Sequence, residues 1–156
     1  MGDRCYLTMQ IRRSDAHNVE EFLGDSPLDH EQFDPKYPGL EWQDDEANYA
    51  ITDDRQAMAE AGIVFIGRHG EGGNYPGYEF ASDGKEMRAW ELSTGGSDYV
   101  LRARKSKIGK REYGVRGKDL QYLNSYVKFY AKCKKLLLQD DAIHKTRIKK
   151  EGGGIR

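Results

Sequence analysis

The chain has few cysteines and no long apolar segment. Cys5 and Cys133 lie far apart, outside any CxxC or Cys/His cluster, so we expect two reduced thiols rather than a disulfide framework. No apolar run approaches the roughly 20 residues of a membrane-spanning helix, and the opening Met1-Gly2-Asp3-Arg4 does not resemble a signal peptide. These absences predict an intracellular, cytoplasmic protein without membrane association.

Motifs of metal, nucleotide and nucleophile sites are also missing. The four histidines show no HxxxH or HxH spacing, and neither cysteine has a second ligand nearby. The chain has no P-loop, no dinucleotide-binding fingerprint and no GxSxG elbow. We therefore predict no metal and no cofactor. The lack of catalytic motifs favours a non-enzymatic protein, and enzymatic function is the alternative.

Charge is distributed unevenly along the sequence, although the net charge is only −1. Residues 1–60 carry 15 Asp and Glu against 5 Lys and Arg, whereas residues 101–156 carry 17 Lys and Arg against 5 Asp and Glu. Such asymmetry indicates a charged partner. In the alternative interpretation, the two ends face each other in the fold or are solvated separately.

The first half of the chain predicts short elements around a long connection. Alternating apolar residues favour a strand over 5–12, and an apolar stripe favours a helix over 15–23 with Ser14 as N-cap and Gly24 as its end. Three prolines make 25–40 an irregular connection. A possible strand over 42–51 and a helix over 54–61 follow.

The second half predicts further strands and a long helix. Ile63 to Ile66 form an apolar run typical of a strand buried on both faces. Turn signals then separate predicted strands over 78–81, 85–93 and 98–104, before a basic linker over 105–118. A helix over 119–139 has an apolar face formed by Leu123, Tyr126, Val127, Tyr130, Cys133 and Leu137.

These elements predict one α+β domain over residues 1–145, followed by a flexible basic tail over 146–156. The expected architecture is a mainly antiparallel sheet with two short N-terminal helices and one long C-terminal amphipathic helix. A chain of 156 residues is long enough for a single domain with a substantial core.

The glycine-rich stretch after the central strand is a candidate ligand site. A rigid strand that opens into such a loop brings backbone N–H groups close to a ligand, and an arginine adds a fork of donors. We expect this loop to bind an anion in a backbone nest. Its candidate residues are Arg68, His69, Gly70, Gly72, Gly73, Asn74 and Tyr75, with His69 and Glu71 as candidate catalytic groups. The alternative is a plain connection between strands.

Arg68-His69-Gly70-Glu71 resembles the RHGE signature of the histidine phosphatase and phosphoglycerate mutase superfamily. The resemblance implies a histidine that accepts a phosphoryl group, an arginine that binds phosphate, and a doubly wound parallel sheet. It covers about four residues. The chain departs from the family pattern because more than sixty residues precede the motif, Asn74 is one position closer, and His144 is the only later histidine.

Two charged surfaces are further candidates. The basic set could track phosphates of a nucleic acid, or it could be the solvated side of a helix; its residues are Arg104, Lys105, Lys107, Lys110, Arg111, Lys128, Lys132 and Lys135. The acidic set, Asp44, Asp45 and Glu46, could mimic nucleic acid and occupy a basic site on a protein. The leading hypothesis is a small accessory binding protein of phage or mobile-element type with a protein or nucleic-acid partner. The alternative is an anion-binding or phosphatase-type domain centred on the glycine loop.

Overall fold

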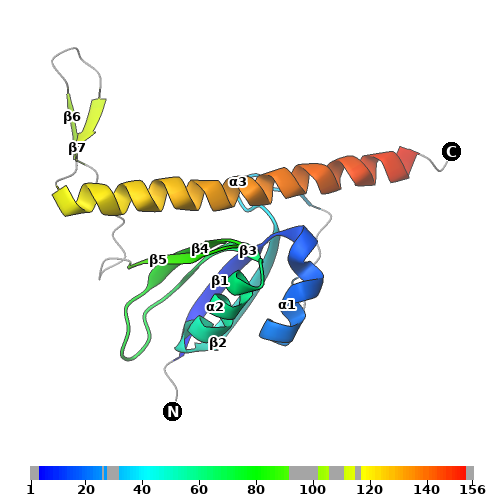
Figure 1. Ribbon diagram of the computed structural model, residues 1–156, viewed down its shortest axis with the longest axis horizontal. Coiled ribbons are helices and arrows are strands. Elements are labelled where there is room, and N and C mark those ends of the chain that lie inside the picture. The colour runs from blue at the N-terminus through cyan, green and yellow to red at the C-terminus, as the bar shows by residue number, and fades with distance from the viewer. Residues whose placement is uncertain are drawn as a thin grey trace.

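The protein is a sheet with helices on both faces (Figure 1). The computed structural model describes residues 4–25, 27, 32–91, 102–105, 111–114 and 117–153, and side chains are described for 4–25, 27, 32–91 and 125–152. Two short helices lie against one face of the sheet, and one long helix crosses the other face and extends beyond both sheet edges. The predicted α+β class with a mainly antiparallel sheet is confirmed.

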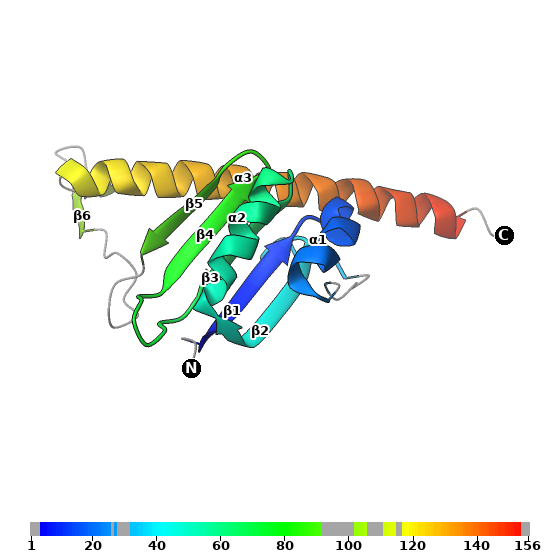
Figure 2. The ribbon, with the colours of Figure 1, turned by 60° about the horizontal axis from the view of Figure 1, so that its bottom comes forward.

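Five antiparallel strands form the sheet in the order β2-β1-β3-β4-β5 (Figure 2). Their bounds are β1 Arg4–Ile11, β2 Leu40–Asn48, β3 Val64–His69, β4 Tyr78–Asp83 and β5 Met87–Glu91. The central strand β3 therefore continues to His69, past the apolar run that ends at Ile66. This antiparallel order differs from the parallel sheet that the phosphatase resemblance implies.

The first face of the sheet is covered by α1 (Ala16–Leu23) and α2 (Thr52–Glu60), each preceded by a 3₁₀ turn, η1 (Arg13–Asp15) and η2 (Tyr49–Ile51). Side chains alternate across a strand, so every second residue of β1 points to these helices. The resulting core includes Leu7, Met9, Ile11, Val19, Met58, Phe65 and Phe80. Packing of these apolar side chains fixes the helices on this face.

The second face is crossed by α3 (Gly117–Gly153). Phe129, Cys133 and Leu137 are buried at i, i+4 spacing and pack on a sheet cluster formed by Val64, Ile66, Ala81 and Trp90. The predicted apolar face was wrong at Val127, which is 57% exposed. Phe129 takes the central position instead because the buried stripe is rotated relative to the predicted one.

A buried ion pair attaches α3 to the start of the fold. Arg13 Nε lies 2.8 Å from Asp141 Oδ1, and both side chains are less than a tenth exposed. The other carboxylate oxygen of Asp141 accepts the backbone N–H of Gly39 at 2.9 Å. Both oxygens are thus bonded to groups outside α3, which sets the position of the helix over the sheet.

The predicted N-cap role of Ser14 was wrong. Ser14 lies within η1, and its hydroxyl and backbone N–H both bond Asp140 of α3. Asp15 precedes α1, but it makes no capping bond, because its carboxylate binds Arg12 at 2.8 Å and the backbone N–H of Val64 at 3.0 Å. Both polar side chains thus hold neighbouring elements together instead of capping the helix.

Residues 105–118 differ from the predicted linker. β6 (Arg102–Lys105) and β7 (Arg111–Gly114) pair as a separate two-stranded sheet, and α3 begins at Gly117. The helix continues to Gly153, well past the predicted end near 139. Many residues after Gln139 are good helix formers, so their polarity does not by itself indicate an unstructured tail. Within the described residues, no helix is long and apolar enough to cross a membrane.

Candidate functional site

Arg68 and His69 lie on opposite faces of the sheet. Both belong to β3, where side chains alternate, rather than to the loop that follows. Arg68 pairs in register with Thr8 and Glu79 on the face crossed by α3, whereas His69 pairs with Leu7 and Tyr78 on the face covered by α1 and α2. The structure therefore does not bring these two predicted site residues to one ligand.

His69 is buried among aromatic rings. It is 3% exposed, and its ring centre lies 5.7 Å from that of Tyr75 and 6.2 Å from that of Phe80. Its Nδ1 lies 2.8 Å from the Gly70 carbonyl, which requires a proton on that nitrogen. Burial lowers the pKa of His69 and the nearby Arg55 charge lowers it further, although the Gly70 carbonyl opposes them. His69 is thus a neutral core side chain.

Arg55 of α2 is a second buried polar group on this face. It is 3% exposed, and its guanidinium lies 4.0 Å from the centre of the Phe80 ring. One amino group donates to Thr52 Oγ1 at 3.1 Å, but Nε and Nη1 have no hydrogen-bond partner among the described residues. Desolvation lowers the pKa of Arg55 to about 10. The cation–π contact with Phe80 offsets part of the cost of burying this charge.

Backbone N–H groups of the glycine loop already donate to protein carbonyls. The N–H of Gly70 donates to the Tyr6 carbonyl at 2.9 Å, and the N–H of Gly72 donates to the Tyr75 carbonyl at 3.0 Å. A Cβ atom on Gly72 would come within 2.2 Å of the Tyr75 ring, so this glycine allows the tyrosine to fold back toward His69. These contacts explain the presence of Gly70 and Gly72 without invoking a bound ligand.

The remaining predicted loop residues point to solvent. Glu71, Gly73 and Asn74 are exposed. None of them lines the cleft described next. Of the residues predicted for this site, Arg68 of β3 alone lines that cleft.

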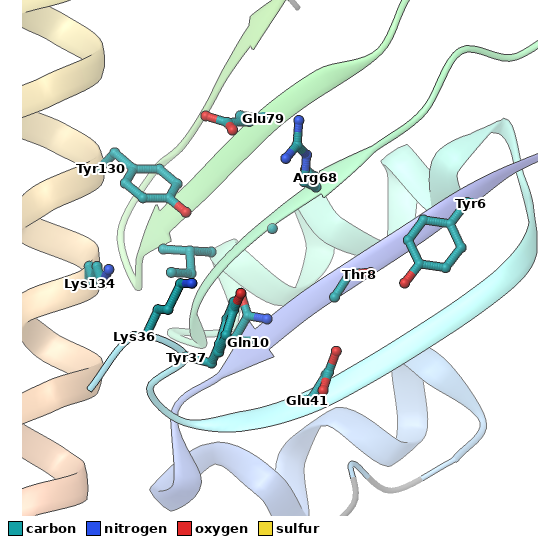
Figure 3. Close-up of a pocket in the computed structure, with 12 residues that line it drawn as sticks. Tyr6, Thr8, Gln10, Lys36, Tyr37, Glu41, Arg68, Glu79, Tyr130 and Lys134 are labelled. Atoms are coloured by element: carbon teal, nitrogen blue, oxygen red, sulfur yellow. The ribbon is translucent and has the colours of Figure 1, made fainter. Parts of the chain in front are cut away.

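A cleft lies beside α3, where the sheet face is left uncovered (Figure 3). Its volume is about 340 Å³, within the range of small-molecule sites. Strands β1, β2, β3 and β4 form its floor, α3 forms one wall, and the turn at Lys36 and Tyr37 closes one end. Register places Gln43, Thr8, Arg68 and Glu79 in one row across this floor.

Twelve residues line the cleft, and most are polar. Three carry positive charge, two carry carboxylates, and three are tyrosines; the set is Lys36, Arg68, Lys134, Glu41, Glu79, Tyr6, Tyr37, Tyr130, Thr8, Gln10, Ile66 and Gly67. Figure 3 shows side chains from the strands, the turn and α3 directed toward one another around the opening. Such convergence of four strands, a turn and a helix forms a site that no local motif encodes.

The cations of the cleft are not neutralised by its carboxylates. Arg68, Lys36 and Lys134 make no ion pair within the described part of the chain. Glu79 accepts the Tyr126 hydroxyl, and Glu41 accepts the amide of Gln43. The cleft therefore offers three free positive charges, while each carboxylate already has one hydrogen-bond donor.

Tyr130 contributes a neutral hydroxyl to this site. Burial raises its pKa to about 12, and the Glu79 carboxylate acts in the same direction, while Arg68 opposes both. Its oxygen is directed into the cleft (Figure 3). The phenol thus keeps its proton at neutral pH and can donate a hydrogen bond to an anionic ligand.

The predicted basic residues are only partly described. Lys128, Lys132 and Lys135 are exposed on α3, and Lys132 bonds Asp83 Oδ2 at 2.7 Å. Arg104, Lys105 and Arg111 lie on β6 and β7, whose side chains fall outside the described residues; Lys107 and Lys110 also fall outside them. Further exposed cations near the end of α3 are Lys145, Arg147, Lys149 and Lys150.

The predicted acidic residues lie on the edge strand β2. Asp45 and Glu46 are exposed and Asp44 is half-buried. Glu46 pairs with Arg4, and its backbone N–H donates to Asp44 Oδ1 at 2.9 Å. Charges on an edge strand prevent pairing with the edge of another sheet, so these carboxylates have a structural use without any partner.

Serine, histidine and aspartate meet elsewhere, between η1 and α3. Ser14 Oγ lies 3.2 Å from His144 Nε2 and bonds Asp140, whose other oxygen lies 3.4 Å from the same His144 nitrogen. In a catalytic triad, the carboxylate instead holds the opposite ring nitrogen. The trio therefore attaches α3 to η1. Among the described residues, no three acidic, histidine or cysteine side chains are grouped to hold a metal ion.

Sequence reasoning missed most of the cleft. Lys36 lies in a segment assigned only as an irregular connection, and Lys134 and Tyr130 were part of a helical pattern without a site. Tyr6 and Thr8 were placed on the polar side of a strand, which was the one available signal. Their meeting with α3 depends on packing and has no local sequence pattern.

Comparison with known proteins does not assign the site. No family matches the chain, and neither the curated proteins nor the solved structures include a significant match.

Proposed function

We propose that the protein is a non-enzymatic binding protein that engages nucleic acid through the basic surface of α3. The observation behind this proposal is the row of exposed cations on α3, none of which forms an ion pair with an acid of residues 1–60 within the described part of the chain. Cations that no protein group neutralises attract a polyanion and release its counterions when they bind phosphates.

The ion pairs of the described residues support this separation of charge. They are Arg4–Glu46, Arg12–Asp15, Arg13–Asp141, Arg88–Glu86, Lys132–Asp83 and His144–Asp140. None of these six joins an acid of residues 1–60 to a base of residues 101–156. Among the described residues, the acids of β2 and the bases of α3 are thus not paired with one another, which supports separate charged surfaces.

The arrangement of α3 adds to this support. Lys128 and Lys135 are seven residues apart, so they lie on the same side of the helix, away from the buried Phe129 and Cys133. The helix also extends past the sheet at both ends, which leaves its terminal turns open to a long partner (Figure 1). An elongated basic helix matches the shape and charge of a nucleic-acid backbone.

A phosphatase-type reaction has less support from the geometry. A phosphoryl acceptor and its phosphate-binding arginine must face one substrate. His69 is instead buried on the face opposite Arg68, and its hydrogen bond with Gly70 uses Nδ1. The remaining role for Arg68 is that of a binding residue.

The proposal is tested by fluorescence anisotropy with labelled mixed-sequence RNA and DNA at low salt. Lys135→Glu should weaken binding, and adding Lys128→Glu should weaken it further. Lys85→Glu makes the same charge change at an exposed residue of the β4–β5 turn, so it is the matched control and should change affinity less. Equal effects of Lys85→Glu and Lys135→Glu would contradict a role for α3.

A second candidate partner is a basic protein surface bound by β2. The observation that favours it is the open edge of this strand, which carries Glu41, Asp45 and Glu46. The exposed carboxylates on this strand can pair with cations on the surface of a basic protein. Charge reversal at Asp45 and Glu46 should then abolish capture of that protein and leave nucleic-acid binding intact. Unchanged capture by this variant would exclude the edge as the binding surface.

A further inference from the structure

We propose that the cleft beside α3 is a binding site for single-stranded nucleic acid. This inference rests on the proposed function and deepens it, since it names the strand state of the ligand and the residues that select it. The site is separate from the exposed lysines on the outer side of α3. Its evidence is the convergence of free cations and exposed tyrosine rings on one open sheet surface.

The cations of the cleft come from three directions. Arg68 stands on the sheet floor, Lys36 on the turn at one end, and Lys134 on the helix wall (Figure 3). None has an ion pair within the described residues. A phosphate group in the cleft would thus meet a guanidinium fork from the floor and ammonium groups from the sides.

The tyrosines supply surfaces for unpaired bases. Tyr37 is 57% exposed and Tyr6 is 47% exposed, although aromatic rings of this size are usually buried more deeply. The Lys36 ammonium lies 5.4 Å from the centre of the Tyr37 ring, so a charge for phosphate and a ring for a base stand side by side. Base stacking on aromatic rings is the common basis of single-strand binding.

Neutral polar groups of the cleft favour unpaired bases as well. The side chains of Thr8 and Gln10 and the Tyr130 hydroxyl line the same space and make no hydrogen bond within the described residues. Glu41 can accept a hydrogen bond from an exocyclic amino group of a base, which a carboxylate does well. These groups would contact the pairing edges of unpaired bases. In a duplex, those edges face the complementary strand and are not accessible.

Binding of an RNA and a DNA oligomer of the same sequence, each single-stranded and as a duplex, tests the site. Tyr37→Leu should lower the affinity for the single strands by about 5- to 100-fold, the loss expected for one stacked base. Affinity for the duplexes should change little. Tyr49→Leu is the matched control, because Tyr49 is also 57% exposed and lies in η2, outside the cleft.

A second pair of variants tests the phosphate contact. Arg68→Gln should weaken single-strand binding and leave unfolding by urea unchanged, since Arg68 is exposed and unpaired. Lys135→Gln removes the same charge outside the cleft and should weaken single strands and duplexes alike. Comparison of the RNA and DNA oligomers shows which sugar the site accepts. A preference for RNA would indicate recognition of the 2′-hydroxyl, and equal affinity would indicate recognition of bases and phosphates alone.

Failure of the cleft is distinguishable from failure of the proposed function. Suppose that Tyr37→Leu and Arg68→Gln keep the single-strand affinity of the unaltered protein while Lys135→Glu loses affinity. This result would contradict binding in the cleft but would support nucleic-acid binding by α3. Equal losses for single strands and duplexes in Tyr37→Leu would also overturn the selectivity. Absence of any binding by the unaltered protein at low salt would overturn both.

Discussion

Arg68 and His69 are adjacent in the chain and are separated by the full thickness of the sheet. Arg68 points to the cleft beside α3, and His69 points to the core beneath α2. The alternation of side chains along β3 causes this separation. One residue is therefore available to a ligand, whereas the other contributes to packing and to the pH dependence of stability.

Stability should fall as the pH is lowered through the range where an exposed histidine takes up a proton. The pKa of His69 in the fold lies below its ordinary value of 6.5, so the unfolded chain binds the proton first. His69→Phe removes this difference. Between about pH 6.5 and 5, the unfolding free energy of His69→Phe should fall less than that of the unaltered protein. One histidine can account for a difference of at most about 1.4 kcal/mol per pH unit. Parallel pH profiles of the two proteins in urea unfolding would contradict the buried neutral state.

Gly67→Ala should destabilise the fold by about 1–3 kcal/mol, the usual cost of overpacking. A Cβ atom at this position would lie 2.5 Å from the Thr8 carbonyl oxygen and 2.6 Å from the Phe80 ring. Gly70→Ala is the control, because no atom lies within 4 Å of its Cβ position. In urea unfolding, the free energy of unfolding of Gly70→Ala should be close to that of the unaltered protein. Similar losses of stability in both variants would show that neighbouring atoms shift easily to make room for a Cβ atom at Gly67.

Asp141→Ala should cost up to about 3–5 kcal/mol, because it removes the buried carboxylate that lies 2.8 Å from the Arg13 guanidinium. It also removes the acceptor of the Gly39 N–H. Glu46→Ala breaks the exposed pair with Arg4 and should cost at most about 1 kcal/mol. Thermal or urea unfolding of the two variants compares these effects. A small effect of Asp141→Ala would mean that this ion pair contributes little to the attachment of α3.

Acid stability should depend on the contact between Lys132 and Asp83. Burial opposes ionisation of Asp83, but the Lys132 hydrogen bond and the backbone N–H groups of Glu86 and Lys85 outweigh it and lower its pKa to about 2. This stabilisation is complete above the ordinary pKa of 3.8 and is lost as the pH falls toward 2. Lys132→Met should therefore flatten the loss of stability between about pH 4 and 2. Lys128→Met, which removes an unpaired lysine from the same helix, should leave the profile unchanged.

The fold was largely predictable because its elements have strong local patterns. Alternation over β1, the apolar run of β3 and the 3–4 spacing on α3 each determine a buried surface without help from distant residues. The rotation of the α3 stripe toward Phe129 was not predictable in this way. It depends on which side chains fit the sheet cluster around Trp90.

The candidate site was much less predictable, because its members meet only in the folded chain. Lys36, Arg68 and Lys134 lie on a turn, a strand and a helix that are far apart in the sequence. Arg68 was identified, but for a loop that it does not occupy. Arg55 gave no signal of burial, since an arginine after Asp53 and Asp54 at the start of a helix is usually solvated.

The salt dependence of nucleic-acid affinity tests the central claim most directly. If α3 and the cleft contact phosphates, affinity should fall linearly on a logarithmic plot, with a slope of about −0.7 per phosphate contact for a single strand. The slope should become shallower by about one such contact when Lys135 is replaced by Gln. No binding at low salt, or binding that is insensitive to salt, would contradict a function based on the basic surface of α3.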